Sequence, residues 1–443
     1  MKTKISMREK LAYGLGDSAC NLVWATIMAF LTIYYTDNVG IAAGVVGTMM
    51  LVTRLLDGGS DLIMGVIIDK TNTKYGKARI WVLLSAPMMA IGLILLFNVP
   101  ESLSMTGKTV YAYVTYIFIA AVAFTACNLA YTTLLGLMTD SPSERTSISS
   151  IRMMFANGTG MLLAVLTPII VKQMGYGKIS WIYAGIAFVF LLITFAGTKE
   201  RVKVQKEKDS ASLPVKESLK MLIQNKYFLR VTIIFLLNYT ANNLCNGAAV
   251  FYASYILGKS TYFGIIAIGM TLPIILLLPT IPGLVKKFGR CKVMIVGMII
   301  QVAAHLFVFF VARDIITVMI GMVVIGIGRT AVASNQFALV GDVVDFGEWK
   351  TGVRLDGITN SITSFGMKVG TGLGAAGVGW ILAAGAYAPN TEQNATAMLA
   401  IRAAFSLIPL IIVAINAVIL MRCKLDKEQP QIIAELTERR TKM

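Results

Sequence analysis

The sequence predicts an all-α polytopic membrane protein of about 12 transmembrane helices, and three observations support this prediction. Apolar residues make up 56% of the 443 positions and charged residues only 14%, whereas about 25% of the residues are charged in soluble globular domains. The mean hydropathy is +0.72. Apolar stretches of roughly 20 residues, the length that a helix needs to cross the hydrocarbon of a bilayer, follow one another with short polar turns between them.

The predicted spans occupy residues 11–36, 42–69, 80–98, 109–138, 147–171, 180–197, 227–257, 262–285, 292–311, 315–343, 356–385 and 397–421. The first ten residues are strongly charged, and the apolar stretch after them is long and lacks a small-residue cleavage site. We therefore expect the first span to be a permanent helix and not a removable signal peptide.

The net charge of +17 raises the question of a nucleic-acid partner, and the distribution of the charge answers it. When the spans are threaded alternately through a membrane, thirty of the 40 Lys and Arg residues fall on the side of the N-terminus and five on the other side. This bias predicts a multi-pass cell-membrane protein with both termini in the cytoplasm, because short cytoplasmic loops are rich in Lys and Arg. The partner of the basic surface is then the lipid bilayer, and no nucleic acid is expected.

Two halves are predicted from the longest hydrophilic interruption, at 198–226. We expect an N-terminal six-helix half at 1–197, a cytoplasmic linker at 198–226, a C-terminal six-helix half at 227–421 and a cytoplasmic tail at 422–443. Basic turns follow the second and the eighth spans, at 70–79 and 286–292. Such echoes indicate parallel repeats, which are typical of a 6+6 major-facilitator architecture that binds its substrate between the halves.

Ionisable residues within a membrane span are costly and are usually paired or functional, and the second span holds several. Asp57 and Asp61 lie one turn apart on one face, about 40° and 6 Å from each other on an ideal helix, with Ser60 close by. Two such carboxylates either hold a monovalent cation such as Na⁺ or retain a proton, and both outcomes make a cation site. The alternative is that Arg54 neutralises Asp57 in a structural pair, which would leave Asp61 unexplained.

Lys368 is the only lysine within a span of the second half, and Gly366, Gly370 and Gly374 follow its helix at four-residue spacing. Small residues at this spacing let membrane helices approach closely. From such a wall Lys368 could pair with an acid or donate to a sugar hydroxyl. Alternatively, its side chain snorkels to the membrane interface.

Several further polar residues lie within spans and are candidates for binding a substrate. Arg152 is a candidate sugar ligand or cytoplasmic gate latch. The uncharged candidates are Asn21, Trp24, Thr125, Asn128, Tyr131 and Asn335. Each alone is more often an interhelical hydrogen bond, but Asn21, Trp24, Asn128 and Tyr131 together supply the amides and aromatic faces that bind sugars. His305 is expected to be a packing residue, and we find no P-loop, HExxH or GxSxG motif, so neither an enzyme nor a cofactor site is predicted.

Several motifs resemble the glycoside-pentoside-hexuronide:cation symporters of the major facilitator superfamily, and the resemblance covers nearly the whole chain. The motifs are YGLGDSACN at 13–21, YYTDN at 34–38, DGGSDLIMGV at 57–66, YGKAR at 75–79, NLAY at 128–131, ER at 144–145 and GDVVDFGEWKTGVRL at 341–355. The resemblance implies sugar uptake that is coupled by alternating access to the entry of Na⁺ or H⁺.

The resemblance also implies roles for individual residues. Asp57, Asp61 and Thr125 match cation-site positions of the melibiose permease branch, and Lys368 matches a lysine that couples the two sites. Asn21, Asn128 and Arg152 match sugar-contacting positions, and Ser364 matches a position near them.

Three departures from the melibiose permease branch qualify these roles. That branch has carboxylates where this chain has Asn21 and Asn128, so the chain is more similar to the glucuronide and pentoside branch, and an acidic sugar would meet less repulsion. Ser60 replaces an asparagine of the sodium site, which leaves Na⁺ and H⁺ both open. Ala130 replaces a proline after the asparagine of the fourth span.

Two other classes of function compete with sugar symport. A transporter of a lipid or another amphipathic solute on the same fold would have a lateral opening and a more apolar cavity. A membrane-embedded enzyme or sensor would need a catalytic constellation, and the sequence contains none that we recognise.

Overall fold

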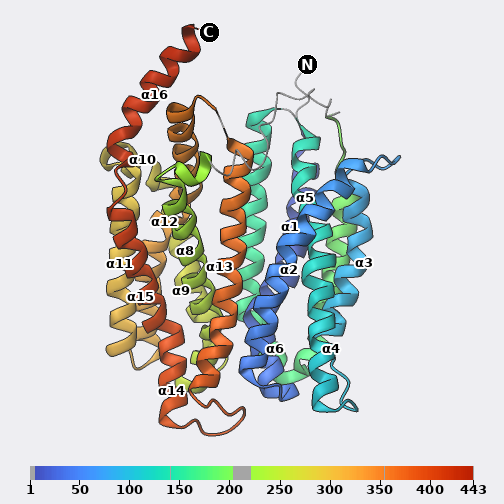
Figure 1. The fold of residues 1–443 in the computed structure, drawn as a ribbon. Coiled ribbons are helices and arrows are strands. Elements are labelled where there is room, and N and C mark those ends of the chain that lie inside the picture. Colours follow the sequence, from blue (N-terminus) through green and yellow to red (C-terminus); the bar gives the residue numbers. More distant parts are fainter. Residues whose placement is uncertain (1–4, 140, 203–220, 354, 443) are drawn as a thin grey trace. The chain divides into compact units, whose positions relative to one another are not determined.

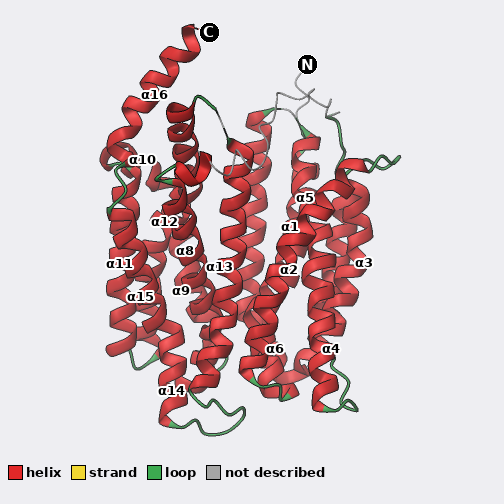
Figure 2. Cartoon of the chain, in the orientation of Figure 1, coloured by secondary structure: helices red, strands yellow, loops and turns green. Residues whose placement is uncertain are grey.

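A computed structural model describes residues 5–139, 141–202, 221–353 and 355–442. Within these ranges the chain consists of helices and the loops between them, without a strand (Figure 2). The predicted all-α class is therefore confirmed.

The helices form two compact units. The first unit contains Met1–Lys206 together with Ala249–Gly264 and Val378–Ala397, and the second contains Glu207–Ala248, Ile265–Gly377 and Met398–Met443. The first unit thus includes two segments that we assigned from the sequence to the second half. The predicted division into halves, linker and tail stays a prediction, and residues 203–220 of that linker lie outside the described residues.

The N-terminal part of the chain forms the helices α1 (Met7–Ile33), α2 (Ala43–Lys70), α3 (Arg79–Leu96), α4 (Met105–Ile117), α5 (Thr125–Met138) and α6 (Pro142–Gly197), labelled in Figure 1. Two π-helical turns interrupt this series, η1 (Tyr34–Val39) after α1 and η2 (Phe118–Phe124) between α4 and α5. Gly175, with φ 77°, interrupts α6. The predicted spans 147–171 and 180–197 are therefore successive helices on either side of Gly175, whose lack of a Cβ permits this backbone.

The rest of the chain forms α8 (Phe228–Phe251), η3 (Tyr252–Ile256), α9 (Tyr262–Leu277), η4 (Leu278–Thr280), α10 (Ile281–Phe288), α11 (Arg290–Phe310), α12 (Ile315–Thr351), α13 (Asp356–Ala384), α14 (Ala395–Arg402), η5 (Ala403–Leu407), α15 (Ile408–Met421) and α16 (Leu425–Lys442). Asp314 caps α12 by accepting from the backbone N–H groups of Ile316 and Thr317, which lack partners within the helix. The tail helix that we expected at QIIAELTERR is part of α16.

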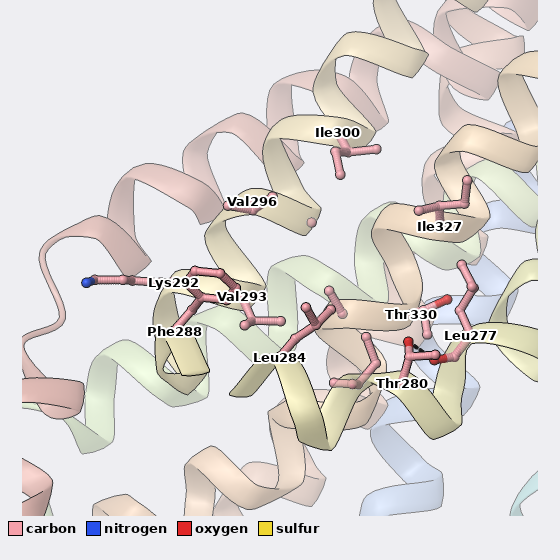
Figure 3. A pocket seen from close by; sticks show the side chains of 13 residues that line it. Leu277, Thr280, Leu284, Phe288, Lys292, Val293, Val296, Ile300, Ile327 and Thr330 are labelled. Carbon is pink, nitrogen blue, oxygen red and sulfur yellow. Dashed lines mark hydrogen bonds between the residues drawn. The ribbon is translucent and has the colours of Figure 1, made fainter. Parts of the chain in front are cut away.

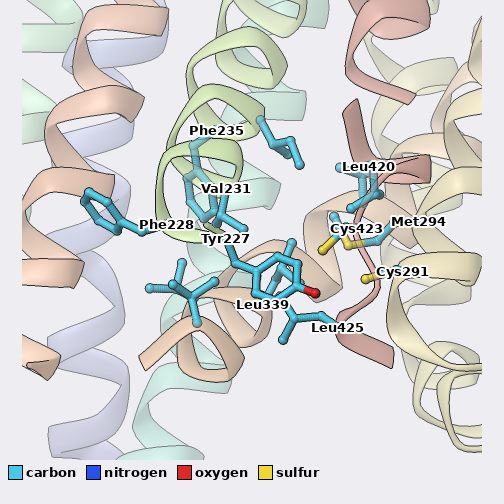
Figure 4. Close-up of a cluster of buried hydrophobic side chains, with 14 of the residues drawn as sticks. Tyr227, Phe228, Val231, Phe235, Cys291, Met294, Leu339, Leu420, Cys423 and Leu425 are labelled. Atoms are coloured by element: carbon cyan, nitrogen blue, oxygen red, sulfur yellow. The ribbon is translucent and has the colours of Figure 1, made fainter. Parts of the chain in front are cut away.

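The core of the second unit is a cluster of buried apolar side chains from α8, α11, α12, α15 and α16 (Figure 4). Tyr227, Phe235 and Leu339 lie within it and are almost fully buried. His305 is buried elsewhere in this unit, where Ser406 Oγ donates to its backbone oxygen at 2.7 Å. Its expected role as a packing residue agrees with this position.

Among the described residues, nine helices are long and apolar enough to cross a membrane, and one of these is the stretch Ser147–Gly197 that Gly175 divides. α2 and α8 coincide with the predicted spans 42–69 and 227–257. α2 carries three charged residues near its middle, Arg54, Asp57 and Asp61. The number of helices that cross the bilayer remains a prediction.

The glycine face predicted on α13 packs closely against α8. A Cβ on Gly370 would lie 2.3 Å from the backbone oxygen of Leu236, and one on Gly374 would lie 2.6 Å from that of Thr240. A Cβ on Gly366 would be 3.3 Å from the Thr232 side chain, a tight contact that requires a small shift of that side chain. The two glycines at 370 and 374 therefore set the distance between the helices.

We expect Gly370→Ala to destabilise the protein by about 1–3 kcal/mol, because a methyl group cannot enter without separating two backbones. Gly341→Ala on α12 is the matched control, since a Cβ there meets nothing within 4 Å. Thermal unfolding of the two purified variants in detergent tests this expectation. Equal unfolding temperatures would show that α8 and α13 can move apart freely.

Candidate functional site

The carboxylate of Asp57 lies buried within the first unit and is fully engaged. Arg54 Nη1 donates to Asp57 Oδ2 at 3.1 Å, one turn earlier on α2, and both side chains are only 5% exposed. Thr125 Oγ1 donates to the other oxygen, Asp57 Oδ1, at 2.8 Å. Each oxygen thus has a donor, as an ionised carboxylate in a low-dielectric interior requires.

Thr125 reaches Asp57 because of the π-helical turn η2, after which it is the first residue of α5. Thr125 Oγ1 also lies 3.3 Å from the backbone oxygen of Ala120, within the same turn. Ser60 Oγ lies 3.2 Å from Thr125 Oγ1. Three predicted cation-site residues, Asp57, Ser60 and Thr125, therefore meet through oxygen atoms.

The Arg54 guanidinium is held from a second side by an aromatic ring. Its Cζ lies 3.7 Å from the centre of the Trp24 ring, a distance at which the ring face attracts a cation. Trp24 also packs against Phe124, with ring centres 4.6 Å apart. The alternative that Arg54 neutralises Asp57 is thus realised in this structure, and Trp24 contacts the charge pair.

Asp61 lies on the next turn of α2 and is half-buried. Its position follows the helix geometry that was predicted, one turn from Asp57 on the same helix. The ion pair with Arg54 therefore explains how the charge of Asp57 is compensated, and Asp57 is one of the two acids that the sequence singled out.

A second charged cluster of the first unit involves a residue that the sequence analysis missed, Asp17. Arg152 Nε donates to Asp17 Oδ2 at 3.0 Å, and Asp17 is buried. The Arg152 guanidinium also lies 5.3 Å from the centre of the Tyr131 ring. Arg152 is therefore not an isolated cation, and its carboxylate partner comes from α1, 135 positions away in the chain.

Tyr131 is fully buried and stacks on Tyr13, with ring centres 4.3 Å apart and planes at 14°. Tyr13 donates its hydroxyl to the backbone oxygen of Tyr131 at 3.0 Å, and Tyr131 donates to that of Tyr13 at 2.7 Å. This reciprocal pair, which we call the tyrosine clasp, joins α1 to α5. One face of the predicted aromatic residue is thus covered by protein.

The two predicted amides flank a further contact between α1 and α5. Cys20 Sγ and Cys127 Sγ lie 3.7 Å apart, and Asn21 and Asn128 are the next residues on their helices. Both asparagines are half-buried, and Asn21 Nδ2 donates to the backbone oxygen of Asp17 at 3.0 Å. The structure therefore brings Asn21 into the neighbourhood of Asp17 and Arg152.

The remaining predicted residues, Asn335, Ser364 and Lys368, belong to the second unit. Asn335 is buried, and its amide donates to the Ala331 backbone oxygen at 2.8 Å, a contact within its own helix. Ser364 is exposed and Lys368 is half-buried on α13. Their roles in binding a substrate stay predictions.

Another polar cluster that the sequence analysis did not single out surrounds Asp37 of η1, within the first unit. Tyr387 donates to Asp37 Oδ1 at 2.7 Å, Tyr255 donates to Oδ2, and Asn390 Nδ2 donates to the Asp37 backbone oxygen at 2.5 Å. Burial and the Asp37 carboxylate raise the pKa of the Tyr387 hydroxyl, which therefore stays protonated and donates. The motif YYTDN contained Asp37, but nothing in the sequence indicated its tyrosine partners.

Comparison with known proteins identifies the class of protein that carries these sites. Residues 12–427 match the model of a family described as MFS/sugar transport protein. The chain belongs to this family of multi-pass membrane transporters, which are not enzymes.

Individual relatives agree with this assignment. The isoprimeverose transporter of Lactiplantibacillus pentosus is 33% identical, with 99% of this chain and 93% of that protein covered. The inner membrane symporter YicJ of Escherichia coli is 34% identical, covering 95% and 93%, and a glucuronide carrier protein homolog of the same species is 28% identical, covering 99% and 97%. The crystal structure of the nucleoside transporter NupG shares the fold, with a TM-score of 0.65 at 12% identity over 94% of this chain and 100% of that chain.

We expect Arg54→Gln and Asp57→Asn each to destabilise the protein by about 3–5 kcal/mol, because each leaves a buried charge without its partner. The double variant should be more stable than the sum of the two losses predicts. Chemical unfolding of the purified variants measures these differences.

The exposed pair of Lys77 and Asp69, with Nζ and Oδ1 at 2.7 Å, provides the control. Lys77→Gln should change the stability by about 1 kcal/mol or less, because water screens the pair. Additive losses in the Arg54 and Asp57 variants would contradict the coupling that the geometry indicates.

Proposed function

We propose that this protein is a secondary active symporter that imports a glycoside, pentoside or hexuronide with Na⁺ or H⁺ by alternating access. The observation that carries the proposal is the oxygen cluster of Asp57, Thr125 and Ser60 between α2 and α5, in a member of a family of sugar transport proteins. The proposed orientation follows the distribution of Lys and Arg, with both termini in the cytoplasm. No organic cofactor takes part in this proposal.

The coupling cation occupies the Asp57 cluster by taking over the role of Arg54. In this structure the Arg54 guanidinium neutralises the charge of Asp57. Na⁺ or a proton, driven by its electrochemical gradient, competes with the guanidinium for the carboxylate. Hydroxyl and carboxylate oxygens, the groups that Asp57, Thr125 and Ser60 provide, are ligands for hard cations. Asp61 supplies the second carboxylate, so that a cation and Arg54 together would meet two negative charges.

The cation binding changes the energy of the whole cluster and so favours one state of the transporter. When a cation neutralises Asp57, the attraction between Asp57 and Arg54 weakens, and Arg54 is held less firmly against Trp24. Coupling arises if the sugar also binds better to the state that the cation favours, because each ligand shifts the equilibrium only by its difference in affinity.

The sugar site is proposed to include Asn21, Asn128 and Arg152 of the first unit. Lys368 and Ser364 remain candidates because of the resemblance to the symporter family. The closeness of Asn21 to the Asp17–Arg152 pair supports a polar, charge-balanced wall. An acidic sugar would meet two amides and a guanidinium, and the glucuronide carrier homolog and the isoprimeverose transporter among the relatives support hexuronides and pentosides as substrates to test.

We expect Asp57→Asn and Asp61→Asn each to abolish gradient-driven accumulation of the sugar, because the cation loses a carboxylate. Thr125→Val should raise the cation concentration for half-maximal uptake about tenfold, which corresponds to the loss of one hydrogen bond or ligand of about 1.4 kcal/mol, whereas Thr125→Ser should retain it. Uptake of labelled glycosides into proteoliposomes, with a sodium gradient or a pH gradient, measures both effects.

Thr132→Val is the matched control for Thr125→Val, since the Thr132 hydroxyl donates within α5, to the backbone oxygen of Asn128 at 2.9 Å. Accumulation that persists in both aspartate variants would show that the cation binds elsewhere. Energy-independent equilibration of the sugar in these variants would confirm that they are folded and have lost only coupling.

We expect Asn21→Asp and Asn128→Asp to reduce glucuronide uptake at least tenfold and uptake of a neutral pentoside far less. A carboxylate at either position would repel the acidic sugar in a site of low dielectric, while it can still accept from a neutral sugar hydroxyl. Competition between the two labelled sugars in the same vesicles gives the ratio directly. An equal loss for both sugars would place these asparagines outside the sugar site.

A further inference from the structure

The second unit contains a cavity of about 550 Å³ that is formed by α9, α10, α11 and α12 (Figure 3). All of its lining residues lie between Leu277 and Ala331. Its volume is in the range of small-molecule sites, which is about 300–1,000 Å³. None of the residues proposed for the cation or the sugar contributes to it.

The hollow results from the path of the backbone. α9 ends at Leu277, and the 3-10 turn η4 redirects the chain into α10, with Pro279 and Pro282 at this bend. Proline cannot continue the hydrogen bonds of a preceding helix. On the opposite wall the small residues Gly297 and Ala331 pack directly against each other, since a Cβ on Gly297 would lie 2.7 Å from that of Ala331.

The lining offers almost nothing to a polar ligand. Thr280 Oγ1 donates to the Leu277 backbone oxygen at 2.7 Å, a bond drawn in Figure 3, and Thr330 Oγ1 donates to that of Gly326 at 2.9 Å. Both hydroxyls thus donate to backbone oxygens three or four residues earlier in the chain. A sugar would lose its bonds to water here without replacement, whereas an acyl chain would lose none.

The rim at one end is basic. Lys292 lines the cavity with its stem, and in Figure 3 its amine extends away from the apolar side chains. Lys286 and Lys287 are exposed on the last turn of α10, and Lys287 lies 5.2 Å from the ring centre of Phe288, another lining residue. Arg290 nearby is already paired with Asp342, so the lysines carry the positive charge of the rim.

We propose that this cavity binds an anionic phospholipid, with one acyl chain between α9–α10 and α11–α12 and its phosphate at Lys287 and Lys292. The bilayer surrounds this face, as the exposed apolar side chains Val296, Ile299 and Ile327 on the same helices indicate. The basic rim complements a negative headgroup, and each lysine near a membrane surface adds to the attraction. The lipid belongs to the cytoplasmic leaflet under the topology proposed above, but the site itself does not depend on sugar transport.

Native mass spectrometry of the full-length protein, stripped of lipid and titrated with phosphatidylglycerol or phosphatidylcholine, tests the proposal. We expect one phosphatidylglycerol to bind more tightly than any phosphatidylcholine. Val296→Trp, which fills the cavity mouth, should abolish this binding. Ile299→Trp is the matched control, because Ile299 is similarly exposed on α11 (50% against 56%) but does not line the cavity.

The headgroup is tested by the double variant Lys287→Gln/Lys292→Gln, which should weaken phosphatidylglycerol binding about thirtyfold. Lys70→Gln/Lys74→Gln, at the end of α2 and in the turn that follows it, should leave this binding unchanged. Retained binding in Val296→Trp, or equal affinity for both lipids, would overturn the proposal. Such an outcome would leave the sugar-uptake experiments untouched, since they concern residues of other surfaces.

Discussion

The compensation of charge at Asp57 constrains the rest of the first unit. A carboxylate removed from water needs a counter-charge and a donor for each oxygen, and Arg54 and Thr125 supply them at 3.1 and 2.8 Å. The Arg54 guanidinium in turn packs against the Trp24 ring, and the turn η2 orients Thr125 toward α2. Three helices and one irregular turn thus surround a single buried carboxylate. This arrangement explains how the apolar first unit accommodates the charged residues of α2.

Departures from ideal helix geometry place the polar side chains that matter. π-helical turns occur next to Thr125, at Asp37 and at Tyr255, and such turns are rare in ordinary helices and frequent at functional sites. Each inserts one residue into the helical period, so that the side chains beyond it rotate relative to those before it. The contacts of Asp57 with Thr125 and of Asp37 with Tyr255 therefore depend on local backbone irregularities that a regular helix would not provide.

Sequence reasoning predicted those features that depend on composition or on one helix. The apolar spans followed from hydropathy, and the Arg54–Asp57 pair was foreseen as an alternative because residues at i and i+3 share a helix face. The Asp17–Arg152 pair was not, since its partners lie on separate helices whose rotation is set by packing. For the same reason the sequence did not reveal that Tyr131, a candidate sugar-binding residue, is buried. The roles of these residues in binding remain predictions.

The tyrosine clasp has a consequence for selectivity. Its two hydroxyls bond to backbone oxygens of the opposite helix, so that a shift of α1 along α5 by a single residue would break both bonds at once. Asn21 and Asn128 sit on these helices next to the Cys20–Cys127 contact, and their spacing is therefore rigid. If both amides contact a sugar, the protein distinguishes substrates by the separation between two groups on the sugar ring. A ligand with the same groups at another separation cannot bind both amides, because their spacing does not adjust.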